Sequence, residues 1–204
     1  SAPGKRSKDD VKITDMLYAC HDAAIEGRPF RHMLDRVEAR FDEIIASLSL
    51  EFTLREEFAE ITRALESGAS RDYAASRGEY LCGKLLAKYL DFKFIDAADA
   101  VRFYDDGKLN EEETNRLLSA ALKKTPYAVV PGFYGATADG RIVTFSRGGS
   151  DISGALVARA CNADLYENWT DVTGFRMTDP RIVPDAQYIA MLTYRELREL
   201  SYMG

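Results

Sequence analysis

The chain has 204 residues, which is enough for one well-packed domain or for two lobes that share a core. Its composition is ordinary for a globular protein, with 46% hydrophobic residues, 29% charged residues and no low-complexity tract. The formal net charge of −6 argues against a nucleic-acid-binding protein, because contacts with phosphates need a basic face. No apolar run approaches the roughly 18 residues of a membrane span, and no signal peptide is recognisable, so we expect no membrane partner.

The cysteines and histidines limit the chemistry that is open to this protein. Cys20, Cys82 and Cys161 lie far apart among apolar or small neighbours, which favours buried structural thiols over disulfides or metal ligands. The two histidines, His21 and His32, cannot form a zinc site without carboxylates, and their scarcity speaks against histidine-based catalysis. We therefore expect a cytoplasmic protein without a metal site of its own.

The two ends of the sequence suggest a piece of a longer polypeptide. The chain begins at Ser1 without an initiator methionine and stops at Gly204, directly after a helical pattern over residues 194–203. Within this piece we expect a mainly helical lobe over about residues 1–125 and an α/β lobe over about residues 126–204.

Four helices are predicted in the first part of the chain. Thr14 and Asp15 suit the start of a helix that Gly27 ends, and Pro29 suits the first turn of the next one. A third helix ends before Gly68, and a fourth covers residues 71–90. Their apolar stripes are typical of a core: Met16, Leu17, Ala19, Ala23, Ala24, Met33, Leu34, Val37, Phe41, Ile44, Ile45, Leu48, Phe58, Ile61, Leu65, Tyr80, Leu81, Leu85, Leu86 and Tyr89.

Strands alternate with helices in the second part of the chain. We predict strands over residues 92–95, 127–130, 141–145, 165–169 and near 188–191, and helices over 111–123, 150–161 and 194–203, with a polar loop over 171–184. This alternation indicates a mostly parallel sheet covered by helices. Ligands bind at the carboxyl ends of such strands, which directs attention to the loops after Val130, Phe145 and Trp169.

Residues 146–151, Ser-Arg-Gly-Gly-Ser-Asp, are the strongest candidate for a binding loop. Gly148 and Gly149 allow a ligand to approach the backbone, and the following helix presents N–H donors and a partial positive charge. Arg147 offers two parallel hydrogen bonds to a carboxylate or phosphate, and Ser150 or Asp151 can cap the helix. A glycine pair alone would favour a plain capped turn. Arg147, the two glycines and Asp151 together favour an anion-binding loop.

Other positions add weaker signals. Gly132 and Phe133 follow a strand and could line a pocket, although a simple loop explains them equally well. Asp171 at a strand end is more often a turn former than a ligand. Gly78 inside a helix costs about 1 kcal/mol relative to alanine, which close approach of a ligand or another backbone would explain. Glu79 beside it could then bind an ammonium group or could be a solvated carboxylate.

Taken together, these segments resemble the motifs of aspartate kinases, members of the amino-acid kinase superfamily. The pattern strand–[GS]-R-G-G-S-D–helix matches residues 146–151, and W-T-D-V-x-G followed by T-D-P-R matches residues 169–174 and 178–181. G-F-x-G matches residues 132–135 and G-E matches residues 78–79. Ser1-Ala2 and Ile13-Thr14-Asp15 match the S-A…[IV]-T-[ND] segment, with extra residues between them. The similarity runs along the whole chain in the family's order.

The resemblance implies an α/β three-layer sandwich, with a mostly parallel central sheet and helices on both faces. It implies ATP-dependent phosphorylation, with Mg²⁺, of the side-chain carboxylate of L-aspartate to 4-phospho-L-aspartate. That reaction stands at the head of lysine, threonine and methionine synthesis. The chain would be an incomplete catalytic domain, with the helical lobe on the substrate side and the α/β lobe on the nucleotide side. Because family members are commonly dimers or larger, we expect the same of the full-length protein.

The resemblance also implies roles for individual residues, with Arg147 and Asp151 as the catalytic pair. The residues expected to bind aspartate are Ser1, Thr14, Glu79, Phe133, Arg147, Gly148, Gly149, Ser150 and Asp151. Those expected to bind the nucleotide are Thr170, Asp171, Arg176, Asp179 and Arg181, although Arg176 stands where many members have a tyrosine.

A carboxylate acceptor suits this inventory, because its pKa near 4 makes it a nucleophile at neutral pH without a strong base. Phosphoryl transfer then depends mainly on positioning and on spreading charge. We expect Arg147 to hold the α-carboxylate of the substrate, and Glu79 with Asp151 to hold its ammonium group.

Some family features are not in this chain: the opening K-[FY]-G-G-[ST] strand, the A-K-V-[LI]-H-P segment and the C-terminal ACT domains. We therefore expect the 204 residues alone to be catalytically poor. Two alternatives stay open. One is a kinase for glutamate, N-acetylglutamate or another acid, against which the aspartate-type motifs count. The other is a binding or regulatory module that holds its ligand without turnover, which the absent phosphate-binding lysine favours.

Overall fold

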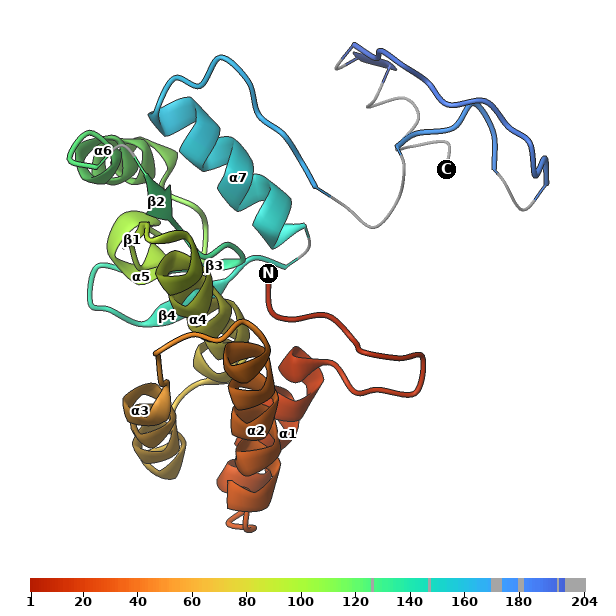
Figure 1. Cartoon of the computed structure of the whole chain (residues 1–204). Coiled ribbons are helices and arrows are strands. Elements are labelled where there is room, and N and C mark those ends of the chain that lie inside the picture. Colours follow the sequence, from red (N-terminus) through yellow and green to blue (C-terminus); the bar gives the residue numbers. More distant parts are fainter. Residues whose placement is uncertain (126, 147, 170–173, 180–181, 194, 197–204) are drawn as a thin grey trace. The chain divides into compact units, whose positions relative to one another are not determined.

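The computed structural model describes residues 1–125, 127–146, 148–169, 174–179, 182–193 and 195–196 (Figure 1). The chain divides into two compact units, Ser1–Tyr166 and Glu167–Gly204, which are described separately below. The predicted boundary near residue 125 therefore does not coincide with the division between these units. None of the helices in the described ranges is long and apolar enough to cross a membrane.

Four helices form the first part of the larger unit and confirm the predicted helical segment. Ser70 caps the fourth of them by accepting a hydrogen bond from the backbone N–H of Tyr73. The prediction that Pro29 lies in a first helical turn is wrong, because the helix begins only at Arg31 and its N-cap is Phe30, whose side chain packs into the core. The helices are α1 (Ile13–Ile25), α2 (Arg31–Ser47), α3 (Arg55–Glu66) and α4 (Arg71–Leu90).

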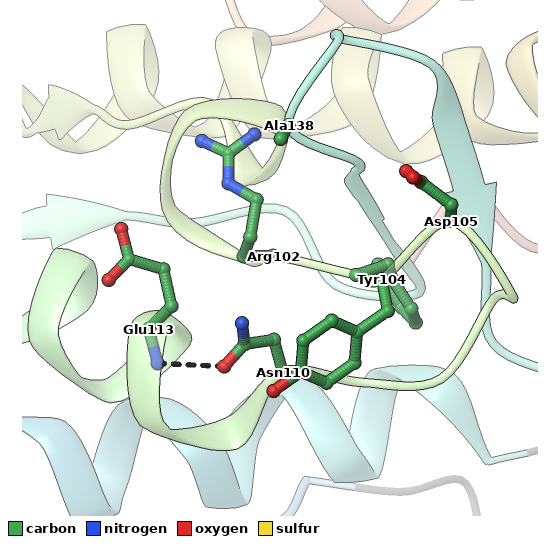
Figure 2. Close-up of a pocket in the computed structure, with 7 residues that line it drawn as sticks. Arg102, Tyr104, Asp105, Asn110, Glu113 and Ala138 are labelled. Atoms are coloured by element: carbon green, nitrogen blue, oxygen red, sulfur yellow. Dashed lines mark hydrogen bonds between the residues drawn. The ribbon is translucent and has the colours of Figure 1, made fainter.

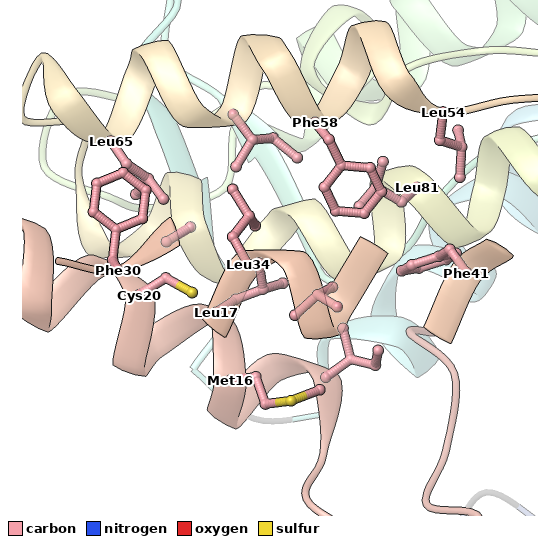
Figure 3. Close-up of a cluster of buried hydrophobic side chains, with 14 of the residues drawn as sticks. Met16, Leu17, Cys20, Phe30, Leu34, Phe41, Leu54, Phe58, Leu65 and Leu81 are labelled. Carbon is pink, nitrogen blue, oxygen red and sulfur yellow. The ribbon is translucent and has the colours of Figure 1, made fainter. Parts of the chain in front are cut away.

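The apolar stripes of these helices meet in one buried cluster (Figure 3). Phe41 from α2 and Phe58 from α3 pack with ring centroids 6.1 Å apart, and Leu17 and Leu81 contribute from α1 and α4. Burial of such side chains removes apolar surface from water and supplies most of the stabilisation of the bundle. Leu86 and Tyr89, also expected in the core, are 42% and 52% exposed on the outer face of α4.

Small sheets and three helices complete the larger unit. β1 pairs with β2 in parallel, β3 pairs with β4 antiparallel, and α6 packs on α7 (Figure 1). The predicted strands at 92–95, 127–130 and 141–145 and the helices at 111–123 and 150–161 are confirmed. The elements are β1 (Lys93–Phe94), α5 (Ala97–Ala100), α6 (Glu111–Leu122), β2 (Ala128–Val129), β3 (Tyr134–Ala136), β4 (Ile142–Thr144) and α7 (Gly149–Ala160).

A single, mostly parallel central sheet is not what the described residues form. They form two separate two-stranded sheets, of which only one is parallel. The expected strand at 165–169 is irregular, with Leu165 73% and Trp169 89% exposed, because no strand in the described ranges pairs with it. In the smaller unit, the strand expected near 188–191 is reduced to one antiparallel bridge between Arg176 and Tyr188. Apart from residues 195–196, which are helical, the predicted closing helix lies outside the described residues.

Two short elements were not predicted, and the cysteines depart from expectation. β3 occupies the segment interpreted as a loop, and Gly135 within it is needed because a Cβ there would collide with the backbone oxygen of Val101. α5 is a single turn capped by Asp96.

Cys20 is buried and Cys82 half-buried, but Cys161 is exposed after the last turn of α7, so the prediction of three buried thiols is wrong.

A buried arginine fastens the loop before α1 to the helical bundle. The side chain of Arg40 is 4% exposed; it lies 2.8 Å from the Asp10 carboxylate and donates to the carbonyl oxygens of Val11 (3.2 Å) and Gly4. Hydrogen bonds from the backbone and side chain of Arg6, together with the charge of Arg40, hold the pKa of Asp10 well below its usual range. This loop leads back to Ser1 and Ala2.

Arg40→Ala should lower the free energy of unfolding by about 1–3 kcal/mol, because it leaves the carbonyl groups of Gly4 and Val11 without their donor, while Asp10 keeps its hydrogen bonds from Arg6. Equilibrium urea unfolding measures this change. Arg36→Ala, one turn earlier on the exposed side of α2, is the matched control and should cost less than about 0.5 kcal/mol. Equal losses in the two variants would contradict an anchoring role for Arg40.

Candidate functional site

The loop before α7 has the backbone geometry of an anion-binding turn. Gly148 is the N-cap of α7 and adopts a left-handed conformation (φ 58°, ψ 22°) that glycine accepts without a steric penalty. The first turn of the helix follows directly and presents N–H groups without helical partners and a partial positive charge. Asp151, exposed on that turn, has a carboxylate oxygen 4.0 Å from the point where a Cβ on Gly148 would lie. Arg147 lies outside the described residues.

Two loops interlock through their glycines: the segment of residues 130–133, between β2 and β3, and the turn that begins α7. A Cβ on Gly149 would lie 2.8 Å from Cβ of Phe145 and 3.0 Å from Cα of Phe133, while a Cβ on Gly132 would lie 3.0 Å from Cα of Ser150. Each glycine thus faces a backbone atom of the opposite loop, and neither position has space for a side chain. The predicted residues Phe133, Gly149 and Ser150 are therefore brought together by direct backbone contact.

A buried serine that the sequence did not single out joins the same two loops. The Ser153 hydroxyl donates to the carbonyl oxygen of Gly149 (2.7 Å) and accepts from the backbone N–H of Phe133 (3.1 Å). Its only signal in the sequence was the spacing of four residues from Gly149, which places both on one face of the helix.

The N-terminal segment reaches this site from the other side. The hydroxyl groups of Ser1 and Ser150 lie 3.3 Å apart, and the side chain of Ala2 lies against Gly78 of α4, where a Cβ would be 2.9 Å from that of Ala2. The helical glycine is thus explained by close approach of another chain segment, one of the two reasons expected from the sequence.

Glu79 is the buried carboxylate of the site. It is 8% exposed, and its Oε2 atom has no hydrogen-bond partner among the described residues. Burial raises the pKa of this carboxyl group, while a hydrogen bond from the backbone N–H of Ala2 opposes the rise. An ionised carboxylate with an unpaired buried oxygen is costly, so the position favours a cationic ligand group.

A second buried charge lies beside Glu79 on α4. Arg77 is 5% exposed, and its guanidinium group lies 4.5 Å from the ring centroid of Tyr73, 4.4 Å from that of Tyr80 and 5.5 Å from that of Tyr134. Cation–π attraction compensates part of the cost of burying this charge. The packing places Tyr134, the first residue of β3, against the helix that carries Glu79.

The remaining predicted residues belong to other segments of the chain. Thr14 is half-buried in the first turn of α1, and within the described part of the chain no hydrogen bond joins it to Glu79 or Ser150. Arg176 and Asp179 belong to the smaller unit, where Arg176 donates to the carbonyl oxygen of Pro184, at 3.2 Å, and to the hydroxyl group of Tyr188. Thr170, Asp171 and Arg181 lie outside the described residues.

A cavity of about 420 Å³ lies elsewhere, beside the N-terminus of α6 (Figure 2). None of the predicted site residues lines it, and several of its polar groups already bond within the protein. Arg102 donates to the carbonyl oxygen of Thr137 (2.8 Å), and the side chain of Asn110 accepts from the N–H of Glu113 (3.1 Å), whose carboxylate pairs with Arg116. We therefore place the candidate site at the interlocked loops rather than in this cavity.

No group of three or more histidine, cysteine, aspartate or glutamate side chains in the described ranges could hold a metal ion. The site is instead a backbone-lined turn at a helix N-terminus together with one buried carboxylate, and the Ser1–Ala2 segment touches both. That combination suits a small ligand that carries both an anionic and a cationic group. It is the kind of site found in enzymes that act on small acidic molecules.

Comparison with known proteins agrees with this class. Residues 20–204 match the amino acid kinase family, and the chain belongs to that family. The chain is 34% identical to aspartokinase 3 of Bacillus subtilis over an alignment of 218 positions, which covers 100% of this chain and 48% of the relative. It is 41% identical over 101 residues to an aspartokinase of Helicobacter pylori, covering 50% of this chain and 25% of the relative.

Solved structures extend the likeness to three dimensions. The aspartate kinase of Clostridium acetobutylicum superposes with a TM-score of 0.94 at 46% identity, covering 100% of this chain and 47% of that one. Aspartokinase III of Escherichia coli, in complex with aspartate and ADP, superposes with a TM-score of 0.72 at 28% identity, covering 88% of this chain and 45% of that one. The chain thus has the amino-acid-kinase fold and spans less than half the length of these relatives.

The interlocked glycines predict a steric penalty. Gly149→Ala should lower the free energy of unfolding by about 1–3 kcal/mol, because its Cβ meets backbone and Cβ atoms that cannot rotate away. Gly4→Ala is the matched control, since a Cβ there meets nothing within 4 Å, and it should change stability by less than about 0.5 kcal/mol. Urea unfolding of both variants measures the difference; a neutral Gly149→Ala would refute the interlock.

Proposed function

We propose that this chain is the main part of the catalytic domain of an aspartate kinase. Such an enzyme transfers the γ-phosphoryl group of ATP to the side-chain carboxylate of L-aspartate and forms 4-phospho-L-aspartate. The single observation that carries the proposal is the likeness of the whole chain to the Clostridium acetobutylicum aspartate kinase. The gathering of Ser1, Glu79, Gly149 and Ser150 at one point supports it, because these residues come from separate segments.

The chemistry of the site follows from the charges of the substrate. Glu79 receives the ammonium group, which gives the buried carboxylate a cationic partner. The N–H groups of the first turn of α7 and the guanidinium group of Arg147 hold the α-carboxylate, and Asp151 helps to orient the ammonium group. The side-chain carboxylate is then free to attack phosphorus, because it is already ionised at neutral pH. Ser1, Thr14 and Phe133 complete the walls around the amino acid.

ATP occupies the nucleotide side through Thr170, Asp171, Arg176, Asp179 and Arg181. Mg²⁺ would be held mainly by the nucleotide itself, because no group of carboxylates in the described residues could hold it alone. When bound, it neutralises negative charge on the phosphates. Every other contribution is positional: the loops hold the amino acid so that its carboxylate faces the phosphorus atom in line with the leaving oxygen.

The same proposal covers the full-length protein. This chain spans less than half the length of its solved relatives. In the full-length protein, the small sheets of this chain are therefore part of a larger, mostly parallel central sheet with helices on both faces. The full-length protein is a cytoplasmic homodimer or larger assembly, and it catalyses the first step toward lysine, threonine and methionine.

A coupled assay that follows ADP release tests the function in the full-length protein. We expect turnover with L-aspartate, little with L-glutamate, and none with N-acetylglutamate, which lacks the ammonium group. Glu79→Gln should lower kcat/KM for aspartate at least a hundredfold, because a charged hydrogen bond in a buried site is lost. Glu66→Gln, an exposed carboxylate at the end of α3, is the matched control and should change kcat/KM less than twofold. A preference for glutamate would contradict the proposed substrate.

The raised pKa of Glu79 predicts proton release on binding. The buried carboxyl group binds a proton more tightly than in the unfolded chain, so its contribution to stability is lost as pH rises from its ordinary pKa near 4 toward the raised value. An ammonium ligand lowers that pKa again, so aspartate affinity should increase with pH across this range. Titration calorimetry in two buffers with different ionisation enthalpies measures the released protons, and Glu79→Gln should abolish the release. Proton uptake would contradict the assignment.

A further inference from the structure

Ser153 is a buried side chain to which no role at the site has yet been assigned. It lies in α7, is 5% exposed, and uses its single hydroxyl group twice, toward Gly149 and toward Phe133. We propose that Ser153 is a positioning residue for aspartate binding: its hydroxyl group fixes the two loops on which the amino acid rests. The inference rests on the function proposed above.

The two hydrogen bonds of Ser153 have different partners: one lies within the same helix, and the other lies on a distant segment. Donation to the carbonyl group four residues earlier is ordinary for a serine inside a helix. Acceptance from the backbone N–H of Phe133 is not ordinary, because the two residues are 20 positions apart and only Ser153 lies in α7, whereas Phe133 lies in the loop before β3. Donation to Gly149 directs a lone pair of the oxygen toward Phe133, so one hydroxyl group couples the loop of Phe133 to the first turn of α7.

Phe133 needs such a restraint. Its φ of 78° lies in the left-handed region, which is strained for a residue with an aromatic side chain. Its carbonyl oxygen accepts from the N–H of Phe145 (2.9 Å), and its N–H donates to Ser153, so both of its backbone polar groups are tied down. Removing the acceptor leaves this N–H unpaired and allows Phe133 to rotate toward an ordinary conformation.

Rotation of Phe133 would disturb the binding surface at once. Its Cα is the atom that a Cβ on Gly149 would touch, and the neighbouring Gly132 faces Ser150, whose hydroxyl group lies 3.3 Å from that of Ser1. A shift of this backbone therefore changes the positions of the groups proposed to surround aspartate. The residues proposed for ATP are on other segments, so the effect should be selective for the amino acid.

Steady-state kinetics of the full-length enzyme test the proposal with three variants. Ser153→Ala should raise KM for aspartate about tenfold and leave KM for ATP within about twofold. Ser153→Thr keeps a hydroxyl group that can bond to the fourth preceding carbonyl, and should stay within about threefold of the wild type. Ser119→Ala is the matched control, because it also removes one hydroxyl bond to α7, at Ala160 (2.7 Å), far from the first turn.

The control separates positioning from stability. Both Ser153→Ala and Ser119→Ala should lower the melting temperature, but only Ser153→Ala should raise KM for aspartate. An unchanged KM for aspartate in Ser153→Ala would overturn the proposal, as would an equal rise in Ser119→Ala. A rise in Ser153→Thr as large as in Ser153→Ala would show that the hydroxyl group is not responsible, and would overturn it as well.

A double-mutant cycle tests whether Ser153 acts through Phe133. In a Phe133→Gly background, Ser153→Ala should add less than about a twofold change in KM for aspartate, because glycine adopts a φ of 78° without strain and no longer needs the restraint. A full tenfold effect in that background would overturn the proposed route. If the wild-type enzyme itself fails to phosphorylate aspartate, the proposed function fails first, and that result is distinguishable from a wild-type enzyme that works and is insensitive to Ser153.

Discussion

The site depends on the close backbone contact between the loop around Phe133 and the first turn of α7. Gly132 faces Ser150 and Gly149 faces Phe133, each at a distance that excludes a Cβ. Because these contacts join backbone to backbone, they leave N–H groups rather than side chains at the surface of the proposed binding site. A backbone surface positions a small anion more rigidly than long side chains do, since less conformational freedom is lost on binding.

The helical bundle provides a charged side chain, Glu79, whereas the backbone surface has none. Its core holds α4 in place, and α4 presents Glu79 from a buried position beside Gly78. The segment that starts at Ser1 passes over that glycine and is fastened to α2 by Arg40. In the site proposed above, substrate recognition is thus divided: one half of the unit supplies backbone donors, and the other supplies a desolvated carboxylate whose raised pKa makes it responsive to a cation.

Much of this arrangement could be predicted from the sequence, because helical periodicity and glycine motifs are local signals. The predictions at α1 to α4, α6 and α7 succeeded. β3 could not be predicted, because Tyr134 to Ala136 is a strand only where β4 and the backbone of Val101 lie against it. The strand expected at 165–169 failed for the opposite reason: a favourable pattern has no partner in the described residues. Whether two strands pair depends on the tertiary structure, and the sequence pattern of a single segment does not show it.

Ser153 illustrates a further limit of sequence motifs. A motif marks the residues that face the ligand, here residues 146–151, whereas a residue that holds two loops together from behind has no distinctive chemistry. In the sequence, Ser153 is one more small residue in a helix; in the structure, its hydroxyl group is the hydrogen-bond acceptor for a strained aromatic residue. The strained conformation of Phe133 persists only if contacts with its surroundings offset the strain, and the hydrogen bond to the Ser153 hydroxyl group is one of these contacts. The precision of the site therefore depends on a buried polar contact as much as on the loop that displays the motif.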